Sequence, residues 1–247
     1  MNRTSEYDFT IIVPVYDEAG NIFTIAQRLD EFKSHCQKKT CILFVDDGST
    51  DGSKDMIEKE CSLRKDFYYI SFSYNCGLSA ALKAGIDYTF SPLLGYIDAD
   101  MQTDPEDFSL LLEHIGSCSM VTGFRARRQD NVFKKIQSRI ANSFRRFMTG
   151  DGAVDTGCPL KVIRTSVAKK FPLFKGMHRF LPALVLLQEG GSYKQIAVRH
   201  YPRKAGVSKF SLANRFWGPF ADCFVYRWMR SRCINYKVSS DNINTAL

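Results

Sequence analysis

Hydrophobic positions along the first half of the chain follow two alternating patterns. Short runs such as Phe9–Val15 are almost continuously apolar, as in a strand buried on both faces. Between such runs, apolar residues recur at helical spacing, as Ile22, Ile25, Leu29 and Phe32 do. This alternation predicts an α/β fold, with a mostly parallel central sheet and helices on both faces. The predicted strands are 9–15, 41–45, 67–72 and 93–97, and the predicted helices are 22–32, 53–60, 78–88 and 105–115.

The second half of the chain is less regular. Residues 118–123 and 193–201 have strand character, and residues 180–187 have the character of a short buried helix. A longer helix is predicted over residues 131–148 from the spacing of its apolar positions. No repeat, low-complexity tract or linker interrupts the chain, so residues 1–247 are expected to form a single domain.

Polar turns follow three of the predicted strands, directly after Val15, Val45 and Ile97. In parallel sheets, ligands bind at the carboxyl ends of the strands. The three turns are therefore expected to converge on one binding site.

The third turn carries Asp98, Asp100 and Gln102 at intervals of two residues. On an extended segment such residues point the same way, so three oxygen-bearing side chains are expected at one spot. Oxygen ligands suit a hard divalent cation, with water and substrate phosphates as the other ligands. Asp104 and Pro105 have the character of a helix N-cap and first helical residue. A solvated capping loop is the alternative, but the strand-end position and Gln102 favour a metal site.

Charge is distributed unevenly along the chain. The net charge is +8, from 34 Lys and Arg against 26 Asp and Glu. Residues 123–148 contribute +7 and residues 199–237 contribute +8, which leaves −7 for the remainder. A basic second half implies an anionic partner, and nucleic acid, a phosphorylated lipid and an anionic membrane surface all qualify.

The cysteine positions and the hydropathy of the chain indicate the cellular compartment in which the protein is expected. The eight cysteines are scattered without a Cys-x-x-Cys pair, and residues 1–9 do not resemble an export signal. Reduced thiols in the cytoplasm are therefore expected. The longest apolar runs, such as residues 180–187, are far shorter than the roughly 20 residues of a membrane span.

Four motifs in order resemble those of the family 2 glycosyltransferases. They are Pro14-Val-Tyr-Asp-Glu18, Val45-Asp-Asp-Gly-Ser-Thr-Asp51, Asn75-x-Gly77 with Ala80 and Gly85, and Asp98-Ala-Asp100-x-Gln102. The resemblance covers about the first 125 residues. It implies a GT-A fold and the transfer of a sugar from a nucleotide-sugar, usually with inversion.

The same resemblance implies residue roles. Pro14, Tyr16 and Glu18 would line the nucleotide pocket, and Asp47 would hold the base. The acidic turn would surround a Mg²⁺ or Mn²⁺ ion that bridges the diphosphate. Such a cation stabilises the charge that develops on the leaving nucleoside diphosphate. For Glu18 a structural role is also open, since the helix dipole favours an acid early in a helix.

The basic second half resembles the polyprenyl-phosphate sugar synthases of the dolichyl-phosphate mannose synthase type. The resemblance is carried by Gly123-Phe-Arg125, Lys134-Lys-Ile-Gln-Ser-Arg139, Asp155-Thr-Gly-Cys158, Met177-His-Arg-Phe180 and Pro202-Arg-Lys-Ala-Gly-Val-Ser-Lys209. In that group the acceptor is a lipid phosphate, and a planar arginine can hold two phosphate oxygens at once. The residues expected at acceptor or donor phosphates are Arg125, Lys134, Arg139, Arg203, Ser208 and Lys209. A solvated surface is expected for Arg127, Arg128, Arg145 and Arg146.

The acceptor also bears on the need for a general base. A hydroxyl acceptor needs one, whereas a phosphate is already anionic at neutral pH. The processive-enzyme motif Gln-x-x-Arg-Trp is absent, because residue 224, ahead of Arg227-Trp228, is Phe. The role of Asp155 is left open: it is a candidate for a general base and, equally, for a turn residue. The expected activity is transfer of a sugar from GDP-mannose or a UDP-sugar to undecaprenyl or dolichyl phosphate.

Two alternatives stay open. The first is a family 2 transferase whose acceptor is a hydroxyl of a cell-envelope polysaccharide or of a lipid A-like glycolipid. The second is a non-enzymatic protein that binds nucleic acid or a membrane surface through its basic charge. The second leaves the ordered acidic motifs unexplained, and the N-terminal half has no basic platform with stacking aromatics. No nucleic-acid partner is therefore expected.

The C-terminal tail interleaves aromatic residues with arginines over residues 210–236. A helix of this kind lies at a membrane interface or packs on the core with a solvated basic side. The expected organisation is a nucleotide-sugar and metal half to about residue 125, an acceptor half over 126–210 and this tail over 211–247. The protein is expected to be cytoplasmic and peripherally attached to the inner face of the membrane, through the tail or through a membrane partner protein.

Overall fold

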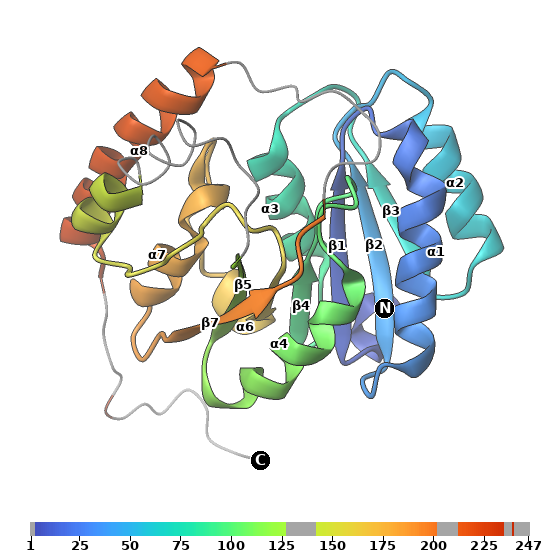
Figure 1. Cartoon of the computed structure of the whole chain (residues 1–247), viewed down its shortest axis with the longest axis horizontal. Helices are drawn as coiled ribbons and strands as arrows, with labels where there is room; N and C mark the ends of the chain where they lie inside the picture. The colour runs from blue at the N-terminus through green and yellow to red at the C-terminus, as the bar shows by residue number, and fades with distance from the viewer. Residues whose placement is uncertain (1–2, 127–141, 202–211, 235–238, 240–247) are drawn as a thin grey trace.

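The computed structural model describes residues 3–126, 142–201, 212–234 and 239 (Figure 1). Its strands are β1 Phe9–Val15, β2 Thr40–Asp46, β3 Phe67–Ser71, β4 Leu93–Tyr96, β5 Met120–Arg125, β6 Lys161–Arg164 and β7 Tyr193–Val198. They form a seven-stranded sheet in the order β3-β2-β1-β4-β6-β5-β7. In it β6 runs antiparallel to β4 and β5, and the other pairings are parallel. The predicted mostly parallel sheet is confirmed.

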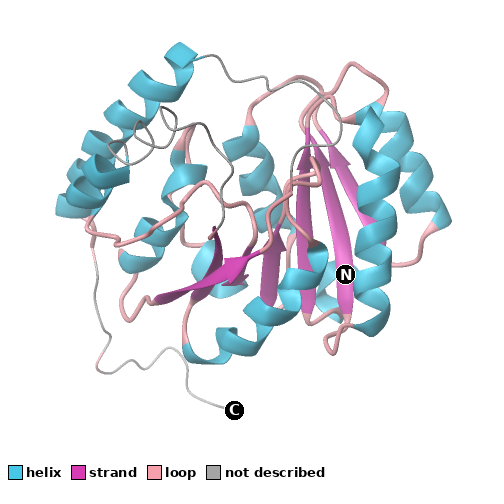
Figure 2. Ribbon diagram, viewed as in Figure 1, coloured by secondary structure: helices cyan, strands magenta, loops and turns pink. Residues whose placement is uncertain are grey.

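Helices cover both faces of this sheet (Figure 2). Side chains alternate along β1, so that Ile11 and Val13 face one core and Ile12 faces the other. The first core is closed by α1 Ala19–His35, α2 Ser53–Leu63 and α4 Phe108–His114. The second is closed by α3 Leu78–Tyr88, α6 Thr165–Ala168, α7 Leu181–Leu186 and α8 Leu212–Arg232. Short 3₁₀ helices are η1 Arg3–Glu6, η2 Pro105–Asp107, η3 Ile115–Ser117 and η4 Met177–Phe180.

Most predicted elements of the first half are present with small shifts in their ends. Asp104 is an N-cap, as predicted: it accepts a hydrogen bond from the Glu106 N–H at 3.2 Å, and Pro105 follows it. Gly85 lets α3 approach the sheet, since a Cβ there would lie 2.5 Å from the Ile12 side chain.

Two elements of the second half depart from the sequence patterns. The strand β6 is not predicted, because it is four residues long and begins with the buried Lys161. Only the end of the helix predicted over residues 131–148 lies in the described part of the chain, where residues 142–149 are helical.

The prediction of a solvated surface is wrong for Arg145. Its side chain is buried and forms an ion pair with Asp151. Arg146 is exposed, as predicted, because neighbouring residues on a helix point in different directions. Arg127 and Arg128 lie outside the described residues.

Helix α8 packs on the core, which is one of the two placements left open for the tail, and its place at a membrane interface stays a prediction. Cys223 and Tyr226 are buried against the core, and the Tyr226 hydroxyl donates to the Ala183 carbonyl at 3.1 Å. On other sides of the helix, Phe224 and Trp228 are 50% and 65% exposed. The helix therefore packs on the core and also presents aromatic residues outward.

Candidate active site

A cavity of about 900 Å³ lies at the carboxyl ends of β1, β2 and β4. The predicted convergence of the three polar turns is confirmed, because each contributes to its wall. The residues predicted to bind the nucleotide-sugar or the metal that line this cavity are Pro14, Tyr16, Glu18, Asp47, Asp98 and Asp100. Segments more than 80 residues apart in sequence thus form one acidic site.

Asp98 and Asp100 lie close together just beyond β4. Asp98 accepts a hydrogen bond from the Tyr96 hydroxyl at 2.7 Å, and Asp100 is only 6% exposed. Burial, followed by the negative charge of Asp100, raises the pKa of Asp98 to about 6. The buried ammonium group of Lys161 opposes this rise. Two neighbouring carboxylates that repel each other in a partly buried wall favour the binding of a cation.

The side chain of Gln102 does not join this pair in the cavity wall. Met101 has a φ of 60°, in the left-handed region, so the chain turns after Asp100. The Gln102 N–H donates to Asp100 Oδ1 at 3.1 Å, and the Gln102 carbonyl accepts from the Tyr201 N–H at 2.9 Å. The expected extended geometry of the three residues is therefore wrong, and a ligand role for Gln102 stays a prediction.

Asp47 lines the cavity and also organises the loop that precedes α3. Its Oδ1 accepts from the Cys76 N–H at 2.7 Å. Its Oδ2 accepts from the Gly77 N–H at 2.8 Å and from the Asn75 side-chain amide at 3.0 Å. Burial raises the pKa of Asp47, and the backbone donors of Cys76 and Gly77 oppose that rise. Base recognition by Asp47 stays a prediction beside this structural role.

Glu18 has a position that suits both of its predicted roles. It lines the cavity, and it also precedes α1, where its Oε2 accepts from the Asn21 side chain at 2.6 Å. Asp51 fixes the neighbouring turn, because it accepts from the Ala19 N–H at 3.1 Å and from Ser53 Oγ at 2.6 Å. The first two polar turns are therefore joined by direct hydrogen bonds.

The opposite wall of the cavity comes from η4, the turn before it, and α8. The only sequence signal for it is the resemblance carried by residues 177–180. The Gly176 N–H donates to Ser79 Oγ at 3.1 Å, and the Ser79 hydroxyl pairs with His178 Nδ1 at 2.7 Å. Burial lowers the pKa of His178 to about 3, so the imidazole is neutral at physiological pH. The charged residues of this wall are Lys175, Arg179 and Asp222.

Arg125 and Asp155 form a buried ion pair outside the cavity wall. Arg125 Nε donates to Asp155 Oδ2 at 2.7 Å, and Arg125 Nη2 donates to Oδ1 at 2.9 Å. Burial opposes ionisation of Asp155, but the Arg125 guanidinium outweighs it and lowers the pKa of Asp155. A carboxylate held in this way is a poor general base, so the structural role of Asp155 is favoured. A phosphate-binding role for Arg125 stays a prediction.

The other predicted phosphate-binding residues lie outside the described part of the chain. They are Lys134, Arg139, Arg203, Ser208 and Lys209.

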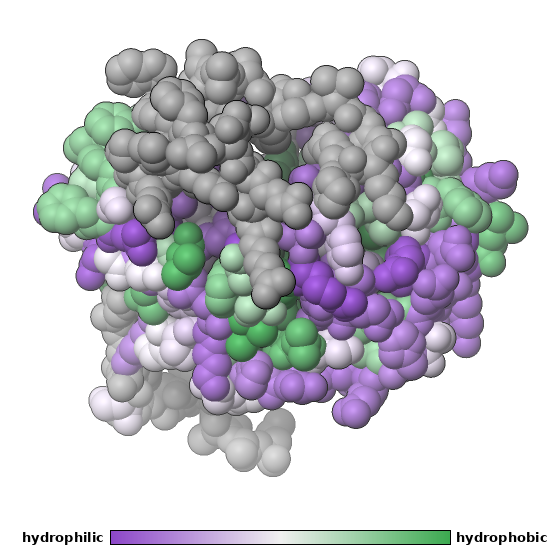
Figure 3. Space-filling model, in the orientation of Figure 1, coloured by the Kyte–Doolittle hydropathy of each residue, from purple (hydrophilic) through white to green (hydrophobic). Residues whose placement is uncertain are grey.

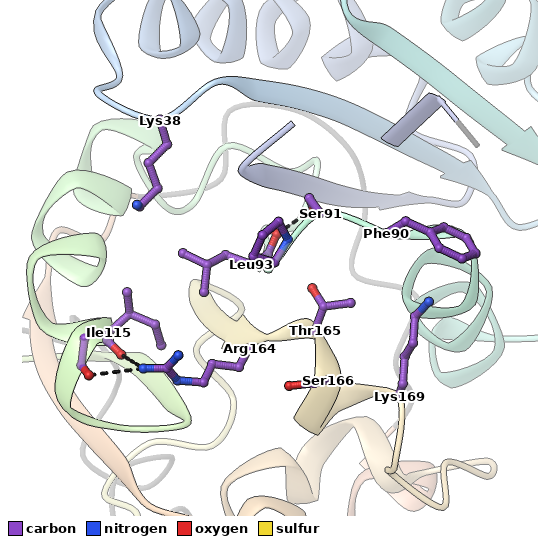
Figure 4. A pocket seen from close by; sticks show the side chains of 11 residues that line it. Lys38, Phe90, Ser91, Leu93, Ile115, Arg164, Thr165, Ser166 and Lys169 are labelled. Atoms are coloured by element: carbon purple, nitrogen blue, oxygen red, sulfur yellow. Dashed lines mark hydrogen bonds between the residues drawn. The ribbon is translucent and has the colours of Figure 1, made fainter. Parts of the chain in front are cut away.

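A second hollow, of about 640 Å³, lies at the amino ends of the strands (Figure 4). Two of its three cations, Arg164 and Lys169, have partners within the protein. Arg164 donates to the carbonyls of Ile115, Gly116 and Cys118, and the Lys169 ammonium lies 3.7 Å from the centre of the Phe90 ring. Because ligands of such sheets bind at the carboxyl ends, the acidic cavity is the better candidate for the active site.

Comparison with solved structures places the fold among known glycosyltransferases. A mannosyltransferase from Pyrobaculum calidifontis, solved with GDP-Man and Mn²⁺, has a TM-score of 0.60 at 16% identity, over 81% of this chain and 58% of that one. Glucosyl-3-phosphoglycerate synthase from Mycobacterium tuberculosis, solved with Mn²⁺ and UDP-glucose, has a TM-score of 0.62 at 14% identity, over 92% of this chain and 79% of that one. The predicted GT-A fold is confirmed.

Curated relatives are similar over most of this chain. Dodecaprenyl-phosphate galacturonate synthase from Rhizobium johnstonii is 30% identical over 218 residues, 85% of this chain and 63% of the relative. Undecaprenyl-phosphate 4-deoxy-4-formamido-L-arabinose transferase from Pectobacterium carotovorum is 29% identical over 204 residues, 82% of this chain and 62% of the relative. This chain thus spans less than two thirds of the length of either relative. The family model for glycosyl transferase family 2 matches residues 10–171, and the chain belongs to that family.

Proposed function

We propose that this protein transfers a sugar from a nucleotide-sugar to a polyprenyl phosphate, with inversion at the anomeric carbon. The observation that carries this proposal is the single acidic cavity that gathers the predicted nucleotide and metal residues of three strand ends. Two relatives named for transfer to dodecaprenyl and undecaprenyl phosphate support the acceptor class. GDP-mannose and UDP-sugars are both candidate donors.

A divalent cation, Mg²⁺ or Mn²⁺, is part of this proposal. The donor set fits such an ion, since Asp98 and Asp100 are two hard oxygen ligands at one place in the cavity wall, where burial and then the negative charge of Asp100 raise the pKa of Asp98. Among the described residues no group of three His, Cys, Asp or Glu side chains is placed to hold a metal. Two carboxylates leave room for water and diphosphate oxygens. When bound, the ion would stabilise the negative charge of the leaving nucleoside diphosphate.

The first experiment is a thermal-shift screen of nucleotide-sugars with and without Mn²⁺. A donor that binds only the folded protein stabilises it by about 2.7 kcal/mol at a concentration of 100 times its Kd. One class of nucleotide-sugar is expected to raise the melting temperature, and only in the presence of the metal. If no nucleotide-sugar raises it under either condition, the proposed donor site is wrong.

Attachment to an anionic membrane surface is the second part of the proposal. None of the described helices has both the length and the apolar character of a membrane span. Four exposed aromatic side chains instead form what we call the aromatic face, namely Phe147, Phe220, Phe224 and Trp228. In Figure 3 hydrophobic residues gather at the edge where Figure 1 places α8.

Two helices share this aromatic face, because the ring of Phe144 stacks on that of Phe220 with centroids 4.8 Å apart. Arg227 and Arg232 are exposed on the same helix, α8. Exposed aromatic and basic residues together suit an anionic bilayer surface, where each basic residue contributes about 1 kcal/mol. Membrane attachment through this surface would bring the cavity close to a lipid phosphate, with or without a membrane partner protein.

Removal of two aromatic side chains tests this attachment. Phe224→Ser together with Trp228→Ser is expected to weaken binding to phosphatidylglycerol vesicles at least about tenfold, because two apolar groups no longer enter the bilayer. The matched control is Phe23→Ser with Tyr88→Ser, whose side chains are 55% and 57% exposed. Vesicle co-sedimentation in low salt measures both. Equal binding of the two double variants would show that the aromatic face is not the attachment surface.

A further inference from the structure

The cavity has an unbalanced set of charges. Among the described residues in its wall, two cations stand against five carboxylates. The carboxylates are Glu18, Asp47, Asp98, Asp100 and Asp222, and the cations are Lys175 and Arg179. Like charges repel one another more strongly in a cavity wall than in open water, because less solvent screens them. An anionic acceptor therefore needs a cation in the wall to approach the reacting carbon.

Arg179 is better placed for that purpose than Lys175. Lys175 is exposed, whereas Arg179 is half-buried in the cavity wall. Other buried arginines of the chain are paired, since Arg125 binds Asp155 and Arg145 binds Asp151. With the residues that the structure describes, Arg179 forms neither a hydrogen bond nor an ion pair.

Arg179 shares the cavity wall with Asp222 and with the hydrogen-bonded pair of His178 and Ser79. Burial lowers the pKa of Arg179, and the negative charge of Asp222 opposes that shift. The segment that carries Arg179 is held in place, because the neighbouring His178 pairs with Ser79 of α3. A positioned guanidinium with open donors suits a phosphate group, which it can bind through two oxygens.

We propose that Arg179 binds the phosphate of the acceptor, and that Asp222 of α8, an acidic residue of the same wall without a direct ion pair to Arg179, opposes the entry of that phosphate. This inference rests on the proposed transfer to a polyprenyl phosphate. It assigns the acceptor phosphate to the wall opposite Asp47, and it makes α8 a part of the acceptor site as well as of the aromatic face. The donor diphosphate is the other phosphate that Arg179 could bind, and the experiment separates the two.

The test measures the binding of each substrate by isothermal titration calorimetry. Farnesyl phosphate, a short prenyl phosphate, is titrated into the protein saturated with nucleoside diphosphate and Mn²⁺, and the nucleotide-sugar is titrated separately. Arg179→Gln and Arg179→Lys are both expected to weaken farnesyl phosphate binding at least tenfold, because lysine keeps the charge but lacks the planar fork. Donor affinity is expected to change less than twofold. Asp222→Asn is expected to tighten farnesyl phosphate binding several-fold, since it removes a competing anion.

A control variant and separate outcomes distinguish a failure of this inference from a failure of the proposed function. Arg3→Gln, an exposed arginine outside the cavity wall, is expected to leave both affinities unchanged. An equal or larger loss of donor affinity in Arg179→Gln would assign the residue to the donor diphosphate and overturn the inference. Unchanged binding of farnesyl phosphate by both Arg179 variants would overturn it as well. If the wild-type protein neither binds farnesyl phosphate nor forms lipid-linked product, the proposed function itself fails.

Discussion

Asp100→Asn is expected to lower turnover by at least about 10³-fold while the protein stays folded. The substitution keeps the shape of a side chain that is 6% exposed, but it removes one of the two negative charges offered to the metal. Without the metal, the leaving diphosphate loses its main electrostatic stabilisation, which in enzymes of other classes is worth several kcal/mol. Steady-state kinetics give the loss in kcat, and calorimetry gives the loss of Mn²⁺-dependent nucleotide binding.

The control for this substitution is Asp87→Asn. Asp87 is an exposed acid on α3 that pairs with Lys83 at 2.6 Å, outside the cavity wall. The control should keep full activity and the melting temperature of the wild type within about 1 °C. Full activity of Asp100→Asn, or full activity of the wild type in EDTA, would contradict a metal role for the acidic turn.

Asp155→Asn is expected to destabilise the protein by about 3–5 kcal/mol, because it leaves the buried guanidinium of Arg125 without its charge partner. Both side chains are largely buried, at 12% and 14% exposure, so solvent screens the pair only weakly. Urea unfolding of Asp155→Asn, Arg125→Met and the double variant gives the coupling energy. The double variant is expected to be more stable than the two single losses added together. Additive losses would show that the coupling energy between Arg125 and Asp155 is zero and that the ion pair does not stabilise the fold.

The same ion pair predicts a dependence of stability on pH. The Arg125 guanidinium lowers the pKa of Asp155 in the folded state below its unfolded value, which is about 3.9. The contribution of Asp155 is therefore complete above the unfolded value and is lost as the pH falls through the folded one. The difference in unfolding free energy between wild type and Asp155→Asn should shrink below about pH 4. A constant difference down to pH 2 would contradict the assignment.

Much of the first half could be predicted because local signals there agree with one another. Continuous apolar runs define β1 and β2, and the polar turns fall at the strand ends that the sheet brings together. Asp104 and Pro105 mark the beginning of a helical segment by their residue types alone. The site was predictable to the same extent, since Asp47, Asp98 and Asp100 follow directly from these strand ends.

The rest could not be predicted because it depends on tertiary contacts. Lys161 makes β6 look polar, yet its ammonium donates to the Cys158 carbonyl inside the protein. The burial of Arg145 depends on Asp151, a residue of the loop that follows its helix. The left-handed conformation of Met101 replaces the extended geometry expected from Asp98 to Gln102, and nothing in the residue types near Asp100 indicates it.

The opposite wall of the cavity also depends on tertiary contacts and could not be predicted from local sequence patterns. Arg179 and Asp222 are 43 positions apart in the sequence and come from η4 and α8. Asp222 lies directly against Gly176, where a Cβ would be 2.3 Å from Asp222 Oδ2. A pattern of hydrophobic and polar residues carries no information about such a meeting of distant segments.

Mass spectrometry of the lipid extract tests the central claim most directly. The protein is incubated with Mn²⁺, the nucleotide-sugar selected by the thermal-shift screen, and equal amounts of undecaprenyl phosphate and a lipid A-like glycolipid. The account predicts one new lipid, undecaprenyl phosphate plus a single sugar residue and no additional phosphate, formed by the wild type and absent with Asp100→Asn. A sugar found on the glycolipid hydroxyl, or released to water with no lipid product, would contradict it.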